Sequence, residues 1–454
     1  MMKGLRSLRF RALALGAVFL STLGAFAQPK ETIVVIHGSV GKGHTTAAEV
    51  AADLARKRNP NAEVILIDLL DFVPEKEREL MLRIYDALTQ GRPDLYDDSF
   101  FDWLDQGRHV ASIGDLPLTS NYRPQKVLEK LKSLKPDMVL TTFPSAAQVM
   151  AKLRGQGHFT DIPVGWVHTD LVDETGFARF ALELDMAFVG APEIRDSWIR
   201  RGVPADRVTA SGMPISDTVR HQQPEEAIEA IRQKYGIKKN VRTVLISSGS
   251  NGVGDYPLMV KQLAAQFPNE ELQIISVSGR HPTHFSNLAA LKLPDNVNLV
   301  NVKGLIPPAD LLGMMQMADG VIGKTGGLTP MELFIRSTAS KDGKALVLLD
   351  VNGGQERPNA DYFRAKGLAV ITKDEGAVGK EMASLLSDAE RLNHMVEAQR
   401  EFVKNIKPDL VADWMTSKPS AKPRLNVELS HVGDYPAPQG LVWDCLRVMR
   451  WSLR

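Results

Sequence analysis

A glycine-rich turn that contains a histidine follows the first strongly apolar run of the chain. Residues 32–36 are TIVVI, and they lead into HGSVGKGHTTAA at residues 37–48. Glycine lets a ligand approach the backbone closely, and the start of a helix favours an anion such as a phosphate. His44 stands at the expected helix start, and an imidazole titrates near neutral pH. The turn therefore predicts a ligand site with His44 as a candidate proton acceptor.

Two well-known phosphate motifs are excluded at this turn. A P-loop requires a glycine at position 36, where this chain has Ile, and a Ser or Thr directly after Lys42, where it has Gly43. The dinucleotide motif G-x-G-x-x-G fails because Thr46 occupies its last position. Taken alone, the turn is equally typical of an ordinary connection between a strand and a helix.

A second glycine-rich segment lies in the other half of the chain, at residues 324–329 (KTGGLT). Gly326 and Gly327 carry no side chains, so backbone N–H groups there can approach a diphosphate. We expect a helix to begin in this segment, with Glu332 in its first turn, and the dipole of that helix would add about half a positive charge. As an acid near a helix start, Glu332 would otherwise only stabilise that helix by a few tenths to about 1 kcal/mol.

The composition is that of an ordinary globular protein. The 454 residues include 55 Lys and Arg against 54 Asp and Glu, and 44% are hydrophobic. This balance gives no argument for nucleic-acid binding. The single cysteine, Cys445, excludes an intramolecular disulfide and a cysteine-rich zinc site. No paired acids or clustered histidines suggest a metal, and we expect no cofactor.

Strand-like and helix-like segments alternate along the chain, which predicts parallel sheets covered by helices on both faces. Expected strands lie at 32–36, 63–67, 135–144, 162–170, 185–189, 242–250, 272–279, 297–302, 320–324, 345–350 and 368–372. We expect two doubly wound, Rossmann-like α/β domains, at 31–217 and 218–412, facing across a cleft. Ligands of such sheets bind beyond the carboxyl ends of the strands.

The two ends of the chain differ from this pattern. Residues 1–30 combine a basic start, an apolar run at 12–27 and a sequence like a cleavage site, Ala25-Phe26-Ala27. This combination is typical of a secretory signal peptide. Sixteen apolar residues are short for a membrane span, which needs about 20. An uncleaved anchor or a misplaced start codon stays open. Residues 413–454 are expected to form a tether and an amphipathic helix.

Six motifs occur in order between about residues 32 and 375. They are Gly41-Lys42-Gly43-His44 with Ala47-Ala48, Lys135-Pro136-Asp137 with Thr142-Phe143-Pro144, Thr169-Asp170, Gly212-Met213-Pro214-Ile215, Lys324 to Thr329 with Glu332, and Gly354-Gln355-Glu356 with Asn359. This series resembles the monogalactosyldiacylglycerol synthase and processive diacylglycerol glucosyltransferase family. Those are GT-B glycosyltransferases, in the class that also holds the lipid II-forming N-acetylglucosaminyltransferase.

The resemblance implies a GT-B fold and inverting transfer of a hexose from a UDP-sugar to a lipid acceptor, with diacylglycerol as the first candidate. It implies His44 and Asp170 as the catalytic residues. It implies a donor site formed by Gly249, Ser250, Arg280, Lys324, Thr325, Gly326, Gly327, Leu328, Thr329, Glu332, Gln355, Glu356 and Asn359. On the acceptor side it implies Gly41, Gly43, Phe143 and Glu174.

The chain departs from the family pattern at two of these positions. Glu174 stands where the family often has a histidine, four residues after the aspartate of the Thr-Asp pair. Thr325 replaces a proline of the second glycine-rich segment. The departures bear more on the identity of the acceptor than on donor binding, and they are compatible with weakened activity.

Two other functions stay open. One is transfer of N-acetylglucosamine to a polyprenyl or other lipid. The other is an exported, non-catalytic sugar- or lipid-binding protein on the same fold, which the signal-like start favours because nucleotide sugars are cytoplasmic. The expected location is accordingly the cytoplasmic face of a membrane, with a periplasmic or secreted location as the alternative.

Contact with a membrane surface is expected at two places. Residues 72–104 lie at the position of the family's membrane-facing mouth, and we expect five of their aromatic side chains to face the membrane: Tyr85, Tyr96, Phe100, Phe101 and Trp103. An extra helical layer over the first domain explains this acidic stretch equally well. Residues 440–454 place apolar side chains on one helix face and arginines on the other, as a surface-lying membrane helix or a helix docked on the protein does.

Overall fold

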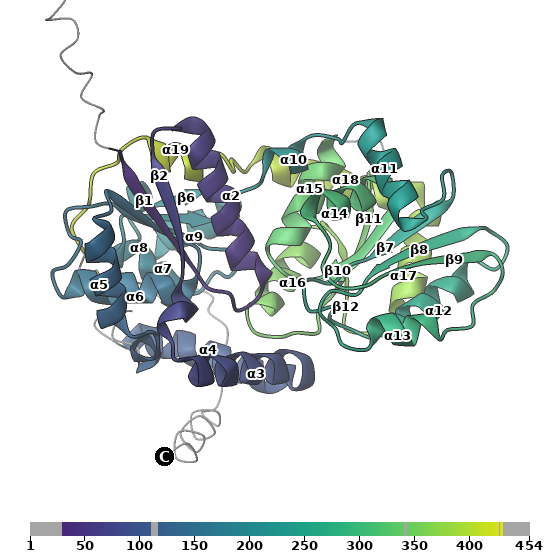
Figure 1. Ribbon diagram of the computed structural model, residues 1–454, viewed down its shortest axis with the longest axis horizontal. Helices are drawn as coiled ribbons and strands as arrows, with labels where there is room; N and C mark the ends of the chain where they lie inside the picture. Colours follow the sequence, from purple (N-terminus) through teal and green to yellow (C-terminus); the bar gives the residue numbers. More distant parts are fainter. Residues whose placement is uncertain (1–29, 110–116, 340–342, 426, 430–454) are drawn as a thin grey trace, which may run out of the picture.

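The chain folds into two parallel β-sheets whose strands alternate with helices (Figure 1). The computed structural model describes residues 30–109, 117–339, 343–425 and 427–429. The signal-like segment at 1–27 and the expected amphipathic helix at 440–454 lie outside the described residues.

The first sheet has six strands in the order β2-β1-β3-β4-β5-β6, and every neighbouring pair is parallel. Its strands are β1 (Thr32–His37), β2 (Glu63–Asp68), β3 (Met138–Thr141), β4 (Val164–Val167), β5 (Met186–Val189) and β6 (Val208–Ala210). The expectation from sequence lacked β6, because three residues are too short to show a periodic pattern.

The second sheet also has six parallel strands, in the order β12-β11-β10-β7-β8-β9. Its strands are β7 (Arg242–Ile246), β8 (Leu272–Val277), β9 (Val297–Val302), β10 (Gly320–Lys324), β11 (Ala345–Leu349) and β12 (Val370–Thr372). The prediction of two doubly wound α/β sheets is confirmed.

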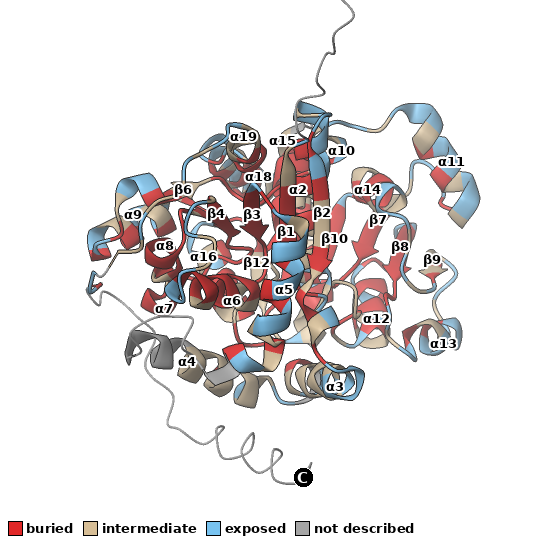
Figure 2. Ribbon diagram, turned by 60° about the vertical axis from the view of Figure 1, so that its left-hand side comes forward, coloured by how far each residue is buried: buried red, intermediate tan, exposed pale blue. Residues whose placement is uncertain are grey.

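Helices cover both sheets, and Figure 2 shows the strands as a buried layer between them. Those connecting the strands of the first sheet are α2 (Lys42–Arg58), α3 (Glu75–Gly91), α4 (Pro93–His109), α5 (Pro124–Leu134), α6 (Pro144–Gly155), α7 (Thr175–Ala178), α8 (Phe180–Glu183) and α9 (Pro192–Arg201). Those that follow are α10 (Asp217–Arg220), α11 (Glu225–Tyr235), α12 (Tyr256–Gln266), α13 (His284–Ala289), α14 (Pro308–Met317), α15 (Leu328–Ala339), α16 (Glu356–Ala365), α17 (Val378–Ser387), α18 (Ala389–Lys404) and α19 (Leu410–Thr416). Within the part of the chain that the structure describes, none of the helices is long and apolar enough to cross a membrane.

The apolar runs become the core because each parallel sheet is covered on both faces. Ile33, Val34 and Val35 are consecutive in β1, and all three are fully buried. The helix that follows β1 is α2, and its buried side chains include Ala47, Ala48, Ala51, Ala52 and Leu54.

The chain first passes from one half to the other at α10 (Asp217–Arg220), and it crosses back near its end. α18 packs on α15 of the second half, whereas α19 packs on α2 of the first. Asp409, between them, accepts hydrogen bonds from Arg58 at 2.7 Å and from Arg220 at 2.6 Å. Because Arg220 belongs to the first crossing, the two crossings are tied together at one edge of the molecule.

A glycine brings the halves into direct contact on the inner side. An added Cβ at Gly327 would lie 1.9 Å from the carbonyl oxygen of Thr169 and 2.5 Å from the Met213 side chain. Gly327 ends the connection from β10 to α15, and Thr169 follows β4. The halves therefore meet where the carboxyl ends of their sheets face each other.

We expect Gly327→Ala to lower the melting temperature, since overpacking against a backbone atom costs about 1–3 kcal/mol. The measurement is differential scanning calorimetry. Gly43→Ala is the matched control, because an added Cβ at Gly43 has nothing within 4 Å. Equal melting temperatures for the two variants would contradict this account of the interface.

Candidate active site

His44 lies in the first turn of α2, on the inner side of the first half. Its Nδ1 is 2.9 Å from the carbonyl oxygen of Thr142 and 2.9 Å from the hydroxyl oxygen of Thr169. A carbonyl oxygen can only accept, so Nδ1 carries the proton and Nε2 keeps its lone pair. Burial lowers the pKa of His44 to about 4, against the opposing effect of the Thr142 carbonyl. The imidazole is therefore neutral at pH 7.

Asp170 lies next to Thr169, beyond the end of β4. Its side chain accepts a hydrogen bond from the Asn359 amide at 2.9 Å, and the Thr169 hydroxyl is 3.5 Å away. Burial raises its pKa to about 6, and the Asn359 hydrogen bond opposes this. Thr169 thus stands between the two predicted catalytic side chains. Because its pKa lies only slightly below 7, Asp170 is mostly but not completely ionised at pH 7.

Asn359, predicted on the donor side, bridges the two halves. Its Nδ2 donates to Asp170 and, at 3.0 Å, to the carbonyl oxygen of Thr325. Its Oδ1 accepts from the backbone N–H of Leu171 at 2.6 Å. The carboxamide is fully buried and its bonds are directed into the interface. Asn359 therefore fixes Asp170 against the loop that follows β10.

Lys324 and Glu356 form an ion pair in the second half. The other carboxylate oxygen of Glu356 accepts from the Asn352 amide at 3.1 Å. The Lys324 side chain crosses Gly249, where an added Cβ would lie 2.7 Å from Lys324 Cε, and its Nζ would lie 3.1 Å from a Cβ on Gly326. The structure thus brings four predicted donor-side residues together, with the lysine carrying positive charge to the glycine backbones.

The other residues of the second glycine-rich segment point in different directions. The Thr325 hydroxyl donates to the Leu349 carbonyl at 3.3 Å, inside the sheet. Leu328 is buried in the core. Gly327 touches the opposite half, as described above, whereas Thr329 is half-buried. The two glycines therefore serve different purposes: Gly326 lies under the lysine, and Gly327 permits the approach of the halves.

The expected position of Glu332 in the first helical turn is wrong. α15 begins at Leu328, which places Glu332 in its second turn. The helix therefore starts earlier than expected, and Pro330, which lacks an N–H, lies in its first turn, where proline is tolerated. Glu332 is half-buried, and burial raises its pKa to about 7, with Arg336 opposing the shift.

The loops after β7 and β8 form one connected unit. Gly249 has a positive φ of 80°, which turns the chain after β7. The carbonyl oxygen of Ser250 accepts from the backbone N–H of Arg280 at 2.8 Å, and the exposed Arg280 guanidinium is 3.5 Å from Asn251 Oδ1. Ser250 and Arg280, both predicted for the donor, are therefore adjacent.

Gln355 contacts the first half through α4. The Tyr96 hydroxyl donates to Gln355 Oε1 at 2.6 Å. Tyr96 packs edge-on against Tyr85 at 5.7 Å, and farther along α4 Trp103 packs against Phe177 at 5.6 Å. The aromatic side chains predicted to reach a membrane thus contact one another and the first half.

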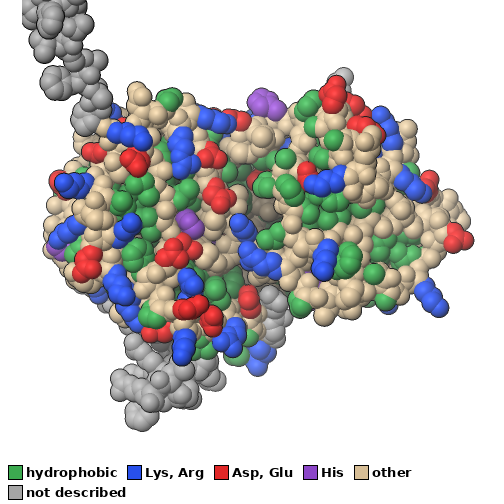
Figure 3. Space-filling view, viewed as in Figure 1, with side chains coloured by type: hydrophobic (Ala, Val, Ile, Leu, Met, Phe, Trp, Pro, Cys, Tyr) green, Lys and Arg blue, Asp and Glu red, His purple; other side chains and the backbone are tan. Residues whose placement is uncertain are grey.

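A mostly apolar cavity of about 300 Å³ lies beneath these aromatic rings. It is lined by Val40, His44, Met81, Leu82, Tyr85, Tyr96, Ser99, Phe100, Trp103, Asn121, Tyr122, Phe143, Pro144, Ser145, Asp170, Phe177 and Gln355. Figure 3 shows the surface hollowed where the two halves meet. The cavity therefore offers apolar walls together with an imidazole, a carboxylate and a carboxamide.

The four predicted acceptor-side residues are placed differently. Phe143 lines the cavity and packs against the His44 ring at 5.0 Å. Gly41, with φ of 106°, is the N-cap of α2, and Gly43 has open space around it. Glu174 is buried at the start of α7 and is not among the residues that line the cavity.

Sequence reasoning missed Thr169, Tyr85 and Tyr96 as site residues. Thr169 was visible as the neighbour of Asp170 in its motif, but nothing local indicated its contact with His44. The sequence assigns the two tyrosines either to membrane contact or to an extra helical layer, since the contact of Tyr96 with Gln355 joins residues that are 259 positions apart.

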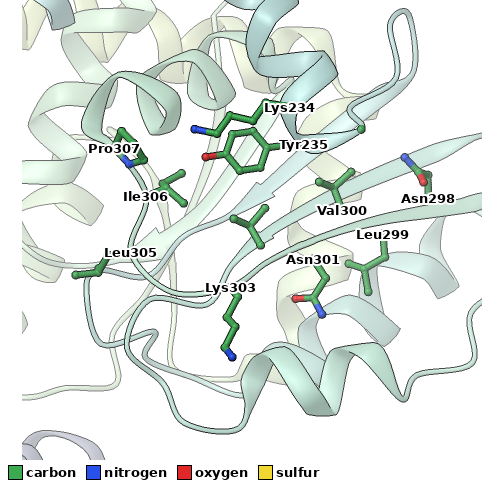
Figure 4. Close-up of a pocket in the computed structure, with 12 residues that line it drawn as sticks. Lys234, Tyr235, Asn298, Leu299, Val300, Asn301, Lys303, Leu305, Ile306 and Pro307 are labelled. Atoms are coloured by element: carbon green, nitrogen blue, oxygen red, sulfur yellow. The ribbon is translucent and has the colours of Figure 1, made fainter.

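A second hollow, of about 550 Å³, lies on the second half between α11 and β9 (Figure 4). The Tyr235 hydroxyl donates to Asp310 at 2.6 Å, and Lys234 pairs with the same carboxylate at 2.7 Å. None of the predicted site residues lines this hollow. Among the residues that the structure describes, no group of three His, Cys, Asp or Glu side chains is placed to hold a metal ion.

Comparisons with known proteins agree with this geometry. Residues 44–215 match the family model of monogalactosyldiacylglycerol (MGDG) synthase. A processive diacylglycerol beta-glucosyltransferase of Bacillus cereus (strain B4264) is 28% identical over 412 residues, which cover 87% of this chain and 95% of the relative. A Bacillus anthracis (strain CDC 684 / NRRL 3495) enzyme of the same name is 25% identical over 407 residues, with the same coverage.

Solved structures support the fold. MurG of Acinetobacter baumannii superposes with a TM-score of 0.52 at 15% identity, over 86% of this chain and all of that one. The MnaA–UDP structure from S. aureus superposes with a TM-score of 0.52 at 13% identity, over 85% and 94% of the two chains. Two facing sheets and these structural matches show a GT-B-like fold, and in sequence the chain is similar to the glycosyltransferases of the MGDG synthase family.

Proposed function

We propose that the protein transfers a hexose from a UDP-sugar to a lipid acceptor, with inversion at the anomeric carbon. Diacylglycerol is the first candidate for this acceptor. The observation that carries this proposal is the apolar cavity whose wall bears His44 and Asp170. An apolar wall suits acyl chains, and the two polar side chains suit the single hydroxyl that diacylglycerol presents.

The donor site proposed here lies on the second half, across the cleft from His44. Lys324 and Arg280 supply positive charge, and the glycine-rich loops supply backbone N–H groups for the diphosphate. The neighbouring charges support this placement, since Lys324 is close enough to contribute to the lowered pKa of His44. The anomeric carbon would then face the cavity.

In the proposed reaction, the acceptor oxygen forms a bond to the anomeric carbon as the bond from that carbon to the diphosphate oxygen breaks. The acceptor proton passes to a base, and the electron pair of the broken bond leaves with UDP. Lys324 and the loop amides stabilise that charge. A single displacement from the face opposite the diphosphate inverts the anomeric carbon.

We propose Asp170 as the base and His44 as a positioning residue, whose Nδ1–H holds the Thr169 hydroxyl beside Asp170. General-base catalysis is most effective when the pKa lies near the working pH. Asp170, with a pKa of about 6, meets this condition better than His44, with a pKa of about 4. The proton-free Nε2 of His44 can accept a hydrogen bond but holds a proton poorly at pH 7.

A lipid acceptor also requires access to a bilayer. We propose that the protein works at a membrane surface, with residues 440–454 as the amphipathic contact predicted from their sequence.

The transfer itself is tested with labelled UDP-glucose, UDP-galactose and UDP-N-acetylglucosamine against vesicles that contain diacylglycerol or a polyprenyl lipid. We expect hexose transfer to diacylglycerol, and NMR of the product to show inversion. Asp170→Asn should lower kcat about 10²–10⁴-fold, as loss of a general base does, with UDP affinity unchanged. Absence of both transfer and a UDP-induced rise in melting temperature would reject the proposal in favour of a non-catalytic protein.

The pH profile distinguishes the two candidate bases. Asp170 is protonated below a pH of about 6, so kcat/KM should fall tenfold per pH unit below that value. His44→Gln should lower kcat and keep this inflection. If the inflection disappears in His44→Gln, the histidine is the base and the assignment is reversed.

We propose that Glu332 accepts hydrogen bonds from the ribose hydroxyls of UDP, as the family resemblance implies, so UDP affinity should rise with pH through about 7. A carboxylate accepts hydrogen bonds from ribose hydroxyls only when it is ionised, and burial delays the ionisation of Glu332 to that pH. Calorimetry at pH 6 and pH 8 measures the change. Glu332→Gln should bind UDP more weakly and without this pH dependence; equal affinities of the unmodified protein at both pH values would refute the ribose contact.

A further inference from the structure

Two consecutive residues of α4 hold the loop that carries Gln355. The Tyr96 hydroxyl donates to Gln355 Oε1 at 2.6 Å. The next residue, Asp97, accepts from the backbone N–H of Gly354 at 2.5 Å and forms an ion pair with Arg357. Asp97 is only 5% exposed. A helix of the first half is therefore fastened to a loop of the second half by three polar contacts.

The shape of the loop fits the helix as closely as the polar contacts do. Gly353 and Gly354 both have positive φ, at 69° and 57°. An added Cβ at Gly353 would lie 2.5 Å from the Pro93 carbonyl oxygen, and one at Gly354 would lie 2.3 Å from the Tyr96 ring. Both glycines are therefore needed for the turn and for the approach of α4.

The neighbouring helix α3 touches the other donor-side loop. Asn251, between β7 and α12, donates to Asp86 of α3 at 3.4 Å. Figure 1 shows α3 and α4 below the first half, with α3 reaching under the line where the halves meet. The pair of helices thus contacts both loops to which we assign the sugar nucleotide.

Tyr96 belongs at the same time to the apolar cavity. Its hydroxyl holds Oε1 of Gln355 at 2.6 Å, and the Tyr85 hydroxyl also interacts with this side chain. An amide N–H₂ donates, and the hydroxyl oxygens of a sugar accept. Loss of the Tyr96 hydroxyl removes the hydrogen bond that holds Oε1 of this carboxamide.

We propose that Tyr96 and Asp97 are positioning residues for the donor sugar, contributed by the half of the protein that binds the acceptor. Asp97 holds α4 against the loop at residues 352–357 through Gly354 and Arg357, and we call these contacts the latch. Tyr96 sets the orientation of Gln355 toward a sugar hydroxyl. The donor-sugar subsite is complete only when the latch is closed, and the residue that completes it also lines the acceptor cavity. This inference rests on the proposed function for the identity of the sugar nucleotide, but the latch itself does not.

The latch is tested by hydrogen exchange followed by mass spectrometry, which needs no substrate. Asp97→Ala should speed exchange of the peptide that contains Gly354 at least tenfold. Asp94→Ala is the matched control: Asp94 lies on the same helix, its side chain is 63% exposed, and it pairs with Arg92. Circular dichroism checks that both variants are folded. Equal exchange at Gly354 in the two variants would overturn the latch.

The orientation of Gln355 is tested with Tyr96→Phe, which removes only the hydroxyl. We expect KM for the UDP-sugar to rise about tenfold, with Kd for UDP alone unchanged, because UDP lacks the sugar. The control is Tyr235→Phe, which loses a hydroxyl hydrogen bond of 2.6 Å on the far hollow. An unchanged KM, or an equal loss of UDP affinity, would refute the role of Tyr96. An unmodified protein that transfers no sugar would refute the proposed function instead, and hydrogen exchange would still decide the latch.

Discussion

The close approach of two backbones, at Gly327 and Thr169, is the constraint on which the site depends. No side chain fits between them, so the carboxyl ends of the two sheets meet almost without spacing. Asn359 uses this proximity, since one carboxamide reaches Asp170, Leu171 and Thr325 together. A wider gap would leave three buried polar groups without partners, which is costly in a protein interior.

Burial at this contact changes the chemistry of the groups around it. Leaving water disfavours the charged form of any ionisable group, so it lowers the pKa of His44 and raises the pKa values of Asp170 and Glu332. All three therefore differ from the same residue types on a surface. The site combines a neutral imidazole with carboxyl groups that titrate near neutral pH, which is the range in which proton transfer to a side chain is useful.

Much of the fold could be predicted because it is encoded locally. The buried strands are unbroken apolar runs such as TIVVI, and α2 follows its alanine pattern closely. The short strand β6 and the early start of α15 were not predicted. A three-residue strand has no measurable period, and the position of a proline within a helical turn is settled only when the helix forms.

The two doubly wound sheets, the order of the motifs and the location of His44, Asp170, Lys324 and Gln355 at or beyond the carboxyl ends of strands follow from the sequence alone. The contacts of these side chains follow only from the way the two halves pack. Tyr96 and Gln355 are 259 positions apart, and Asp170 and Asn359 are 189 positions apart. No local sequence pattern can indicate a contact between residues that are so far apart in the chain. The same limit applies to Gly327 and to every shifted pKa, because close approach and exclusion of water arise only after the two halves have packed against each other.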